Sequence, residues 1–182
     1  TNNIRPVRTP SDMKGLKIRT PPLESIIKSM EALGANAVSI PYGDTYMALK
    51  TNVADGQENP LANIGDMKFF EVQKYMTMID YQFHPEPFDV NLDFFNSLPA
   101  DLQNILEEGA WVYTEKQNEL RRELNDYYFD MIVGGGVTVY EPTEAERQLF
   151  VSAMKPVYDH FVNKGTFTQA DLDEMRRIVE ED

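Results

Sequence analysis

The sequence contains no cysteine and only two histidines. Disulfide bonds, thiolate catalysis and cysteine-ligated zinc are therefore excluded, and two histidines are too few for a metal site built from several imidazoles. No apolar run approaches the roughly 18 residues that a bilayer-spanning helix needs. These absences remove several classes of enzyme and predict no resident metal or cofactor.

Positive charge is also scarce. Lysine and arginine number 17 against 30 aspartate and glutamate residues, which gives a formal net charge of -13 and a pI of about 4.5. Without a basic patch to offset this balance, nucleic acid and anionic membrane surfaces are poor partners. A small anionic ligand remains compatible, because one local arginine outweighs distant acidic charges in a screened solvent.

The residues that are present predict a packed α/β domain. The 182 residues are 42% hydrophobic and 11% aromatic, enough for one sizeable domain or two small ones. The first part alternates short apolar runs with helical periodicity. Gly34 marks the end of the first helix, and Gly43-Asp44 opens the next one. We expect strands at 15–20 and 37–40, a helix from residue 23, and a short helix after Asp44 that buries Tyr46, Met47 and Leu49. This order favours a parallel sheet covered by helices.

The second part is mainly helical. One helix is expected from residue 61 to about residue 74, followed by strand candidates at 75–79 and 88–92. A run from Pro99 to about Val133 exceeds the usual length of a globular helix, so a bend or break is expected within it. The prediction ends with a strand at 137–140, one helix from about residue 142 to residue 161, and a last helix from Thr168.

Three side chains are candidates for holding a small carboxylate. Arg19 ends the strand-like run GLKIRT, Tyr42 follows AVSIP, and Asn59 lies in the loop TNVADGQENP. A guanidinium binds a carboxylate with two parallel hydrogen bonds, an amide donates to an anion, and an aromatic ring packs on the ligand. Each residue also has a purely structural alternative: a surface salt bridge for Arg19, an Asn-Pro turn for Asn59, and a ring at the edge of the core for Tyr42.

Other polar groups offer weaker patterns. Asp55 and Glu58 are a candidate acid–base pair, but a loop does not fix their separation. His84 and Glu86 are a candidate for metal binding or for acid–base chemistry. The run Gly134–Gly136 follows a helix, so it predicts a helix end and not a phosphate loop. No enzyme motif emerges from the spacing.

A series of motifs in one order resembles a known family, the extracytoplasmic solute receptors of tripartite ATP-independent periplasmic (TRAP) transporters, of the C4-dicarboxylate-binding (DctP) type. The motifs are KGLKIRTP, ALGAN, PYGDTY with Ala48-Leu49, TNVADGQENPL, Lys68-Phe69 and EVQKY. The likeness continues more weakly through NSLPADLQ to the end. It implies a two-lobed α/β fold of the periplasmic-binding-protein type (type II-like), which closes on an organic acid and delivers it to a membrane permease from the periplasm.

The resemblance also implies roles for particular residues. Arg19 stands at the position of the arginine that binds the ligand carboxylate in this family. Asn59 stands at the position of a second hydrogen-bond donor, and Tyr42 at the position of a residue that contacts the body of the ligand. Where the family often has a histidine, this chain has Tyr81, with His84 a little later. We add Tyr81 and Glu58 to the predicted ligand-binding residues. No metal ligand set beside the ligand is evident.

The resemblance further predicts the domain organisation. The opening residues TNNIRPVRTPSDMKG do not look like a natural chain start, so we expect the C-terminal portion of a longer receptor, mainly its second lobe with a hinge strand and long helix. Residues 1–84 would begin the second lobe, 85–134 would form a crossover strand and hinge-spanning helix, and 135–182 would return to the second lobe. Apolar surface meant for the other half is expected to cause dimerisation, exchange of elements or poor ligand binding.

Two other functional classes stay open. An enzyme would use Asp55, Glu58 or Glu86 as acid and base, and it would gather perturbed carboxylates in one pocket. A helical ligand-sensing or interaction module would use the long helix near Trp111, with a large exposed apolar stripe and no converging polar site.

Overall fold

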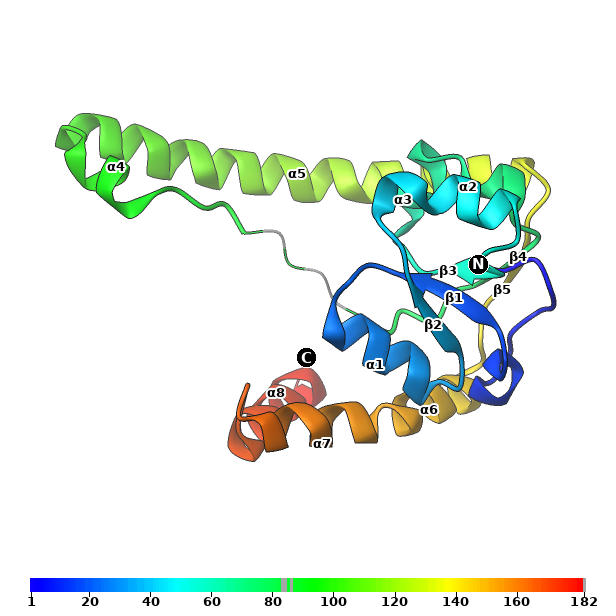
Figure 1. Ribbon diagram of the computed structural model, residues 1–182. Coiled ribbons are helices and arrows are strands. Elements are labelled where there is room, and N and C mark those ends of the chain that lie inside the picture. The colour runs from blue at the N-terminus through cyan, green and yellow to red at the C-terminus, as the bar shows by residue number, and fades with distance from the viewer. Residues whose placement is uncertain (83–84, 86, 182) are drawn as a thin grey trace.

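The computed structural model describes residues 1–82, 85 and 87–181 (Figure 1). Its strands are β1 (Lys17–Thr20), β2 (Asn36–Ser39), β3 (Gly56–Gln57), β4 (Tyr75–Thr77) and β5 (Thr138–Tyr140). Its α-helices are α1 (Glu24–Ala32), α2 (Thr45–Lys50), α3 (Leu61–Asp66), α4 (Leu92–Ser97), α5 (Ala100–Gly134), α6 (Glu144–Ala153), α7 (Lys155–Lys164) and α8 (Gln169–Glu181). Short 3-10 turns are η1 (Pro10–Met13), η2 (Tyr42–Asp44) and η3 (Phe69–Val72).

The strands form a parallel sheet joined through the first residues of the chain. β1 pairs in parallel with β2 and β3, and β4 pairs in parallel with β5. Asn2 forms antiparallel bridges to Gly56 of β3 and to Tyr75 of β4. Residues 1–3 therefore lie between the two groups of strands, and β1 to β5 all run in one direction. The predicted α/β class with a parallel sheet is confirmed.

Helices cover both faces of the sheet (Figure 1). On one face, α1 packs against α7, and together with α6 they cover a core that contains Leu16, Ile18, Met30, Phe150 and Val157. On the other face, α2, α3 and the end of α5 pack over a second core, formed by Leu49, Ile64, Phe69, Ile132 and Val137. The alternation of β1 explains the first core, since Leu16 and Ile18 are two residues apart and share one side.

Local signals set several of the element ends as the sequence predicts. Gly34 has φ of +95° after α1, a conformation that favours glycine and closes the helix. Thr143 caps α6 by accepting from the backbone of Glu146, whose carboxylate accepts from the Thr143 N–H at 2.8 Å. These caps place the helices so that their apolar faces meet the sheet.

Two predicted elements are wrong in detail. The single helix expected over 61–74 is divided into α3 and η3, because Lys68 adopts φ of +54°. The expected strand at 88–92 is absent: residues 88–91 have no regular structure, and Asn91 caps α4 by accepting from the Phe94 N–H at 2.9 Å. The hinge strand predicted there is thus replaced by a loop and a helix.

Two predicted helices also differ from the structure. The expected break in the long helix is absent, since α5 runs without interruption through 35 residues. The single helix expected over 142–161 is two helices, because Pro156 in the first turn of α7 cannot continue the hydrogen bonding of α6. Met47, predicted to be buried, is 55% exposed.

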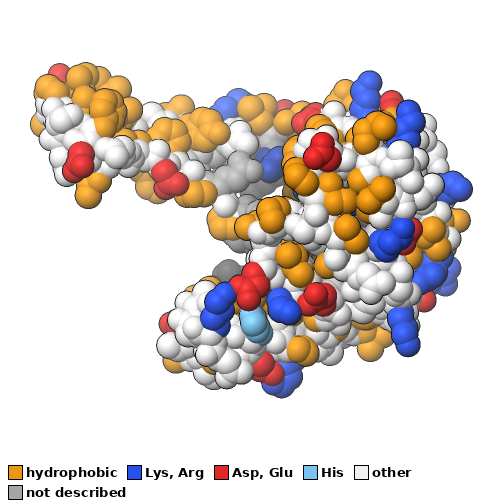
Figure 2. Space-filling view, viewed as in Figure 1, with side chains coloured by type: hydrophobic (Ala, Val, Ile, Leu, Met, Phe, Trp, Pro, Cys, Tyr) orange, Lys and Arg blue, Asp and Glu red, His pale blue; other side chains and the backbone are white. Residues whose placement is uncertain are grey.

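The molecule has a projecting arm, which we define as residues 88–113. Figure 1 shows α5 extending far beyond the sheet, with α4 folded against its distal end. No residue of this arm is buried, and Trp111 is 69% exposed. Figure 2 shows hydrophobic side chains along it and a hollow between it and the C-terminal helices. In the described part of the chain, no helix is both long enough and apolar enough to cross a membrane.

Candidate functional site

The predicted site residues lie at or after the carboxyl ends of four strands, at one edge of the sheet. Arg19 lies in β1 one residue before its end, Tyr42 lies just after β2, Glu58 and Asn59 follow β3, and Tyr81 follows β4. Because β1 to β4 are parallel, these residues share the carboxyl edge of the sheet. Open α/β sheets bind their ligands at this edge.

Arg19 is a buried cation held by a backbone carbonyl. Its side chain is 2% exposed, and its Nε donates to the Ile40 carbonyl at 2.9 Å. Burial lowers the pKa of Arg19, while the nearby charge of Glu58 and then Tyr42 oppose that shift. Among the described residues no carboxylate forms an ion pair with Arg19, so a surface salt bridge does not account for it. The fork of two Nη groups suits a carboxylate.

Tyr42 packs beside this guanidinium. The Arg19 Cζ lies 5.8 Å from the centre of the Tyr42 ring, within cation–π range. The hydroxyl of Tyr42 accepts from Asn63 Nδ2 at 3.0 Å, and its ring meets Phe69 edge to face at 6.2 Å. Tyr42 is nevertheless 39% exposed, so one part of it is accessible to a ligand. Asn63 was missed because it stands in no motif, and Phe69, although part of the motif Lys68-Phe69, was given no role in the site.

Asn59 is oriented by its neighbour Gln57. The Asn59 Nδ2 donates to Gln57 Oε1, and Gln57 Nε2 donates in turn to Thr1 Oγ1 at 2.9 Å. Gln57 is 1% exposed. This chain of amides fixes which way the Asn59 amide group faces. Gln57 was part of the singled-out loop, but nothing in the sequence distinguished it as a positioning residue.

Glu58 and Tyr81 form a direct pair. The Tyr81 hydroxyl donates to Glu58 Oε2 at 2.7 Å. Burial, and then the Glu58 carboxylate, raise the pKa of Tyr81, so the hydroxyl stays protonated and remains a donor. This bond joins the loop after β3 to the segment after β4.

The structure brings together some predicted groups and separates others. Arg19 meets Tyr42, and Glu58 meets Tyr81. Asp55 precedes β3 whereas Glu58 follows it, and Asp55 Oδ2 accepts from the Lys17 N–H at 2.8 Å. The two carboxylates of the enzyme hypothesis therefore stand at opposite ends of one strand.

His84 and Glu86 lie outside the described residues. Within the described ranges, no group of three or more acidic and histidine side chains is placed to hold a metal ion. The interaction-module hypothesis predicted an exposed apolar stripe near Trp111, which the arm provides, but it also predicted no converging polar site.

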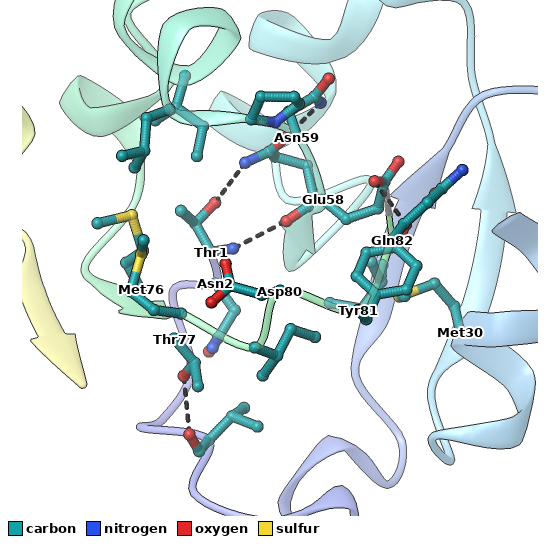
Figure 3. Close-up of a pocket in the computed structure, with 18 of the residues that line it drawn as sticks. Thr1, Asn2, Met30, Glu58, Asn59, Met76, Thr77, Asp80, Tyr81 and Gln82 are labelled. Carbon is teal, nitrogen blue, oxygen red and sulfur yellow. Dashed lines mark hydrogen bonds between the residues drawn. The ribbon is translucent and has the colours of Figure 1, made fainter. Parts of the chain in front are cut away.

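A cavity of about 330 Å³ opens beside the site (Figure 3). Glu58, Asn59 and Tyr81 line it, together with Thr1 and the segment 76–82. Arg19 and Tyr42 are not among the lining residues. This cavity is therefore lined by three of the predicted site residues but not by the arginine that best suits a carboxylate.

Comparisons with known proteins agree on one family. Residues 1–165 match the profile of the bacterial extracellular solute-binding protein family 7. The 2,3-diketo-L-gulonate-binding periplasmic protein of Escherichia coli is 34% identical over 163 residues, 89% of this chain and 49% of that protein. The C4-dicarboxylate-binding periplasmic protein of Vibrio cholerae is 35% identical over 161 residues, 86% of this chain and 47% of that protein.

Among solved structures, a TRAP periplasmic solute-binding protein from Sulfitobacter sp. NAS-14.1 with bound β-D-galacturonate superposes with a TM-score of 0.85. It is 29% identical in sequence, and the match covers 91% of this chain and 54% of that one. The chain thus spans about half the length of the curated relatives that it matches.

Proposed function

The chain belongs to the bacterial extracellular solute-binding protein family 7, and we propose that it forms the part of a periplasmic receptor that grips a small organic acid for a TRAP permease. The motif order in the sequence had predicted this family. The family is one of solute-binding proteins, and we propose that this member catalyses no reaction.

The observation that carries the proposal is the environment of Arg19. A buried guanidinium without an ion pair among the described residues is costly, and a ligand carboxylate would offset that cost. The bond from Nε to Ile40 and the ring of Tyr42 hold the guanidinium in place, so that its fork is oriented before the ligand arrives.

In this proposal, the other predicted site residues contact the rest of the ligand. Asn59 would donate to the acid, and Tyr42 would pack on its body. Glu58 and Tyr81, joined by their hydrogen bond, would contact polar groups of the ligand beyond its carboxylate. The relatives' named ligands, a diketogulonate, C4-dicarboxylates and a galacturonate, all carry a carboxylate.

We also propose the lobe boundaries of the family pattern for this chain. Residues 1–84 and 135–182 would form one lobe around the sheet, and 85–134 would cross to the other. Closure of two lobes would exclude water from the acid bound at the already buried Arg19, and so strengthen the hydrogen bonds between them. The arm, whose apolar side chains are exposed, fits a segment that belongs partly to the other lobe.

A thermal-shift screen of mono- and dicarboxylates, keto acids and sugar acids tests the proposal. A binding acid raises the melting temperature by mass action. Arg19→Ala should abolish that shift, and Arg19→Lys should weaken binding by about 1.5 to 3 kcal/mol in titration calorimetry, because lysine lacks the planar fork.

The matched control is Arg5→Lys. Arg5 donates to the carbonyls of Asp12 and Lys14 at 2.8 and 2.6 Å, so its replacement tests the loss of an arginine with backbone partners outside the site. An acid that shifts the wild type, Arg5→Lys and Arg19→Ala equally would overturn the role of Arg19. Absence of any shift across the panel would return the enzyme and interaction-module hypotheses to first place.

A further inference from the structure

The ring of Tyr42 is held in one orientation beside Arg19. The guanidinium lies on one side of it, with Cζ 5.8 Å from the ring centre. The ring of Phe69, which is fully buried, meets it edge to face, with 80° between the two planes. Since Phe69 belongs to the second core, Tyr42 is fixed to the body of the fold although part of it is exposed.

A third contact fixes the hydroxyl of Tyr42. Helix α3 begins directly after Asn59, because Pro60 is its N-cap residue and accepts from the Ile64 N–H at 3.1 Å. Asn63 therefore lies in the first turn of α3, about one turn after Asn59. Its Nδ2 donates to the Tyr42 hydroxyl at 3.0 Å. The segment after β3 thus brings two amides, one after the other, to the site.

Tyr42 and Asn63 together present one unused donor and one unused acceptor. Because Nδ2 of Asn63 donates to the hydroxyl oxygen, the hydroxyl proton points away from Asn63 and can be donated elsewhere. Among the residues that the structure describes, none accepts this proton and none donates to Asn63 Oδ1. A ligand hydroxyl both accepts and donates, so it matches both atoms, whereas a carboxylate only accepts.

The charges at this edge of the sheet also favour a neutral group beside the ligand carboxylate. The predicted site residues Arg19, Tyr42, Glu58, Asn59 and Tyr81 contain one cation and one carboxylate. Arg19 suffices for one ligand carboxylate. A second one would find no second cation in this set and would meet the charge of Glu58, which is close enough to act on the pKa of Arg19. Like charges brought together weaken binding, and a hydroxyl avoids that cost.

We propose that Tyr42 and Asn63 select ligands by their hydroxyl groups, so that the preferred class is acids with one carboxylate and several hydroxyls, such as aldonic and uronic acids. The Tyr42 hydroxyl donates to an oxygen of the ligand, and Asn63 Oδ1 accepts from a ligand hydroxyl. Asn63 is also a positioning residue, since it orients the Tyr42 hydroxyl. The inference rests on the proposed function, because Arg19 first holds the carboxylate.

Titration calorimetry with paired acids tests this inference. D-gluconate is compared with hexanoate and D-glycerate with propionate, so that the members of each pair differ in their hydroxyls, and succinate represents the dicarboxylates. The hydroxy acids should bind the wild type more tightly than their partners and more tightly than succinate. Tyr42→Phe keeps the ring and should weaken binding of the hydroxy acids by about 3- to 10-fold, the effect of one hydrogen bond, without changing binding of their partners.

Asn63→Ala should lower the same preference, because it removes both the acceptor and the group that orients the hydroxyl. The matched control is Tyr46→Phe. The Tyr46 hydroxyl donates to Glu71 Oε2 at 2.9 Å, so this variant also loses a hydrogen-bonded hydroxyl, but at a position that is not among the predicted site residues. The ratio of the two affinities within each pair should be the same in Tyr46→Phe as in the wild type.

The outcomes separate this inference from the receptor function. A Tyr42→Phe variant that weakens both members of each pair equally would show a structural role alone and would overturn the inference. Binding of succinate in preference to both hydroxy acids would do the same, and in either case the receptor function would stand. If no acid binds the wild type, in these titrations or in the thermal-shift screen, the receptor function fails and the inference fails with it.

Discussion

The balance of forces around Arg19 distinguishes this side chain from the other predicted site residues. Removal from water lowers the pKa of its guanidinium, and the charge of Glu58 offsets part of that cost. Glu58 in turn accepts a hydrogen bond from Tyr81. A carboxylate brought to Arg19 would therefore bind a cation that is already desolvated and fixed, which reduces the ordering cost of binding.

How far the sequence predicts the site depends on the kind of residue. Arg19 and Tyr42 could be located because they end apolar runs, and strand ends gather at one edge. The pairing of Tyr81 with Glu58 could not, since it joins two loops 23 residues apart whose paths depend on the whole sheet. The contact of Asn63 with Tyr42 was hidden for the same reason. The roles of all these residues in binding stay predictions.

At the scale of elements, the close contact between α3 and α5 depends on a glycine, Gly65, which has no side chain. A Cβ built on Gly65 would lie 2.2 Å from Cδ1 of the Tyr128 ring. The Tyr128 hydroxyl also donates to Asp66 Oδ1 at 2.6 Å, which holds the ring in place. Gly65→Ala should therefore destabilise the fold by about 1 to 3 kcal/mol through overpacking, as measured by urea denaturation.

Gly109→Ala is the matched control, since it makes the same substitution within a helix where a Cβ meets nothing within 4 Å. It should leave the core unchanged and raise the helical circular dichroism signal, because alanine favours a helix by about 1 kcal/mol over glycine. A Gly65→Ala variant as stable as Gly109→Ala would show that the two helices can move apart without cost.

The elements were easier to predict than their interruptions. Periodicity located β1, β2, α1 and α8, because each lies between strong turn or capping residues. The division at Lys68 was invisible, since a left-handed lysine is set by packing and not by propensity. The continuity of α5 was also missed, because average helix lengths describe helices that end on a compact core.

At the scale of the whole molecule, the arm predicts self-association. Leu92, Phe94, Ile105 and Trp111 are each more than half exposed, and a large exposed apolar surface of this kind favours association. Light scattering should give a mass that rises with protein concentration above the 20.9 kDa of one chain. The triple variant Leu92→Ser, Ile105→Ser, Trp111→Ser should remain at that mass.

The control replaces two apolar residues outside the arm, Met47→Ser and Val53→Ser, each of which is 55% exposed in the native chain. These changes should leave association unaltered. A native chain that scatters as one monodisperse monomer at all concentrations would contradict the prediction.

The uninterrupted length of α5 has a mechanical consequence. Its 35 residues give a rod of about 52 Å that contains no proline. Such a rod transmits rotation without absorbing it, and a turn of about 10° at one end displaces the other by roughly 9 Å. Small angular changes near the sheet would thus be amplified into large translations at the tip.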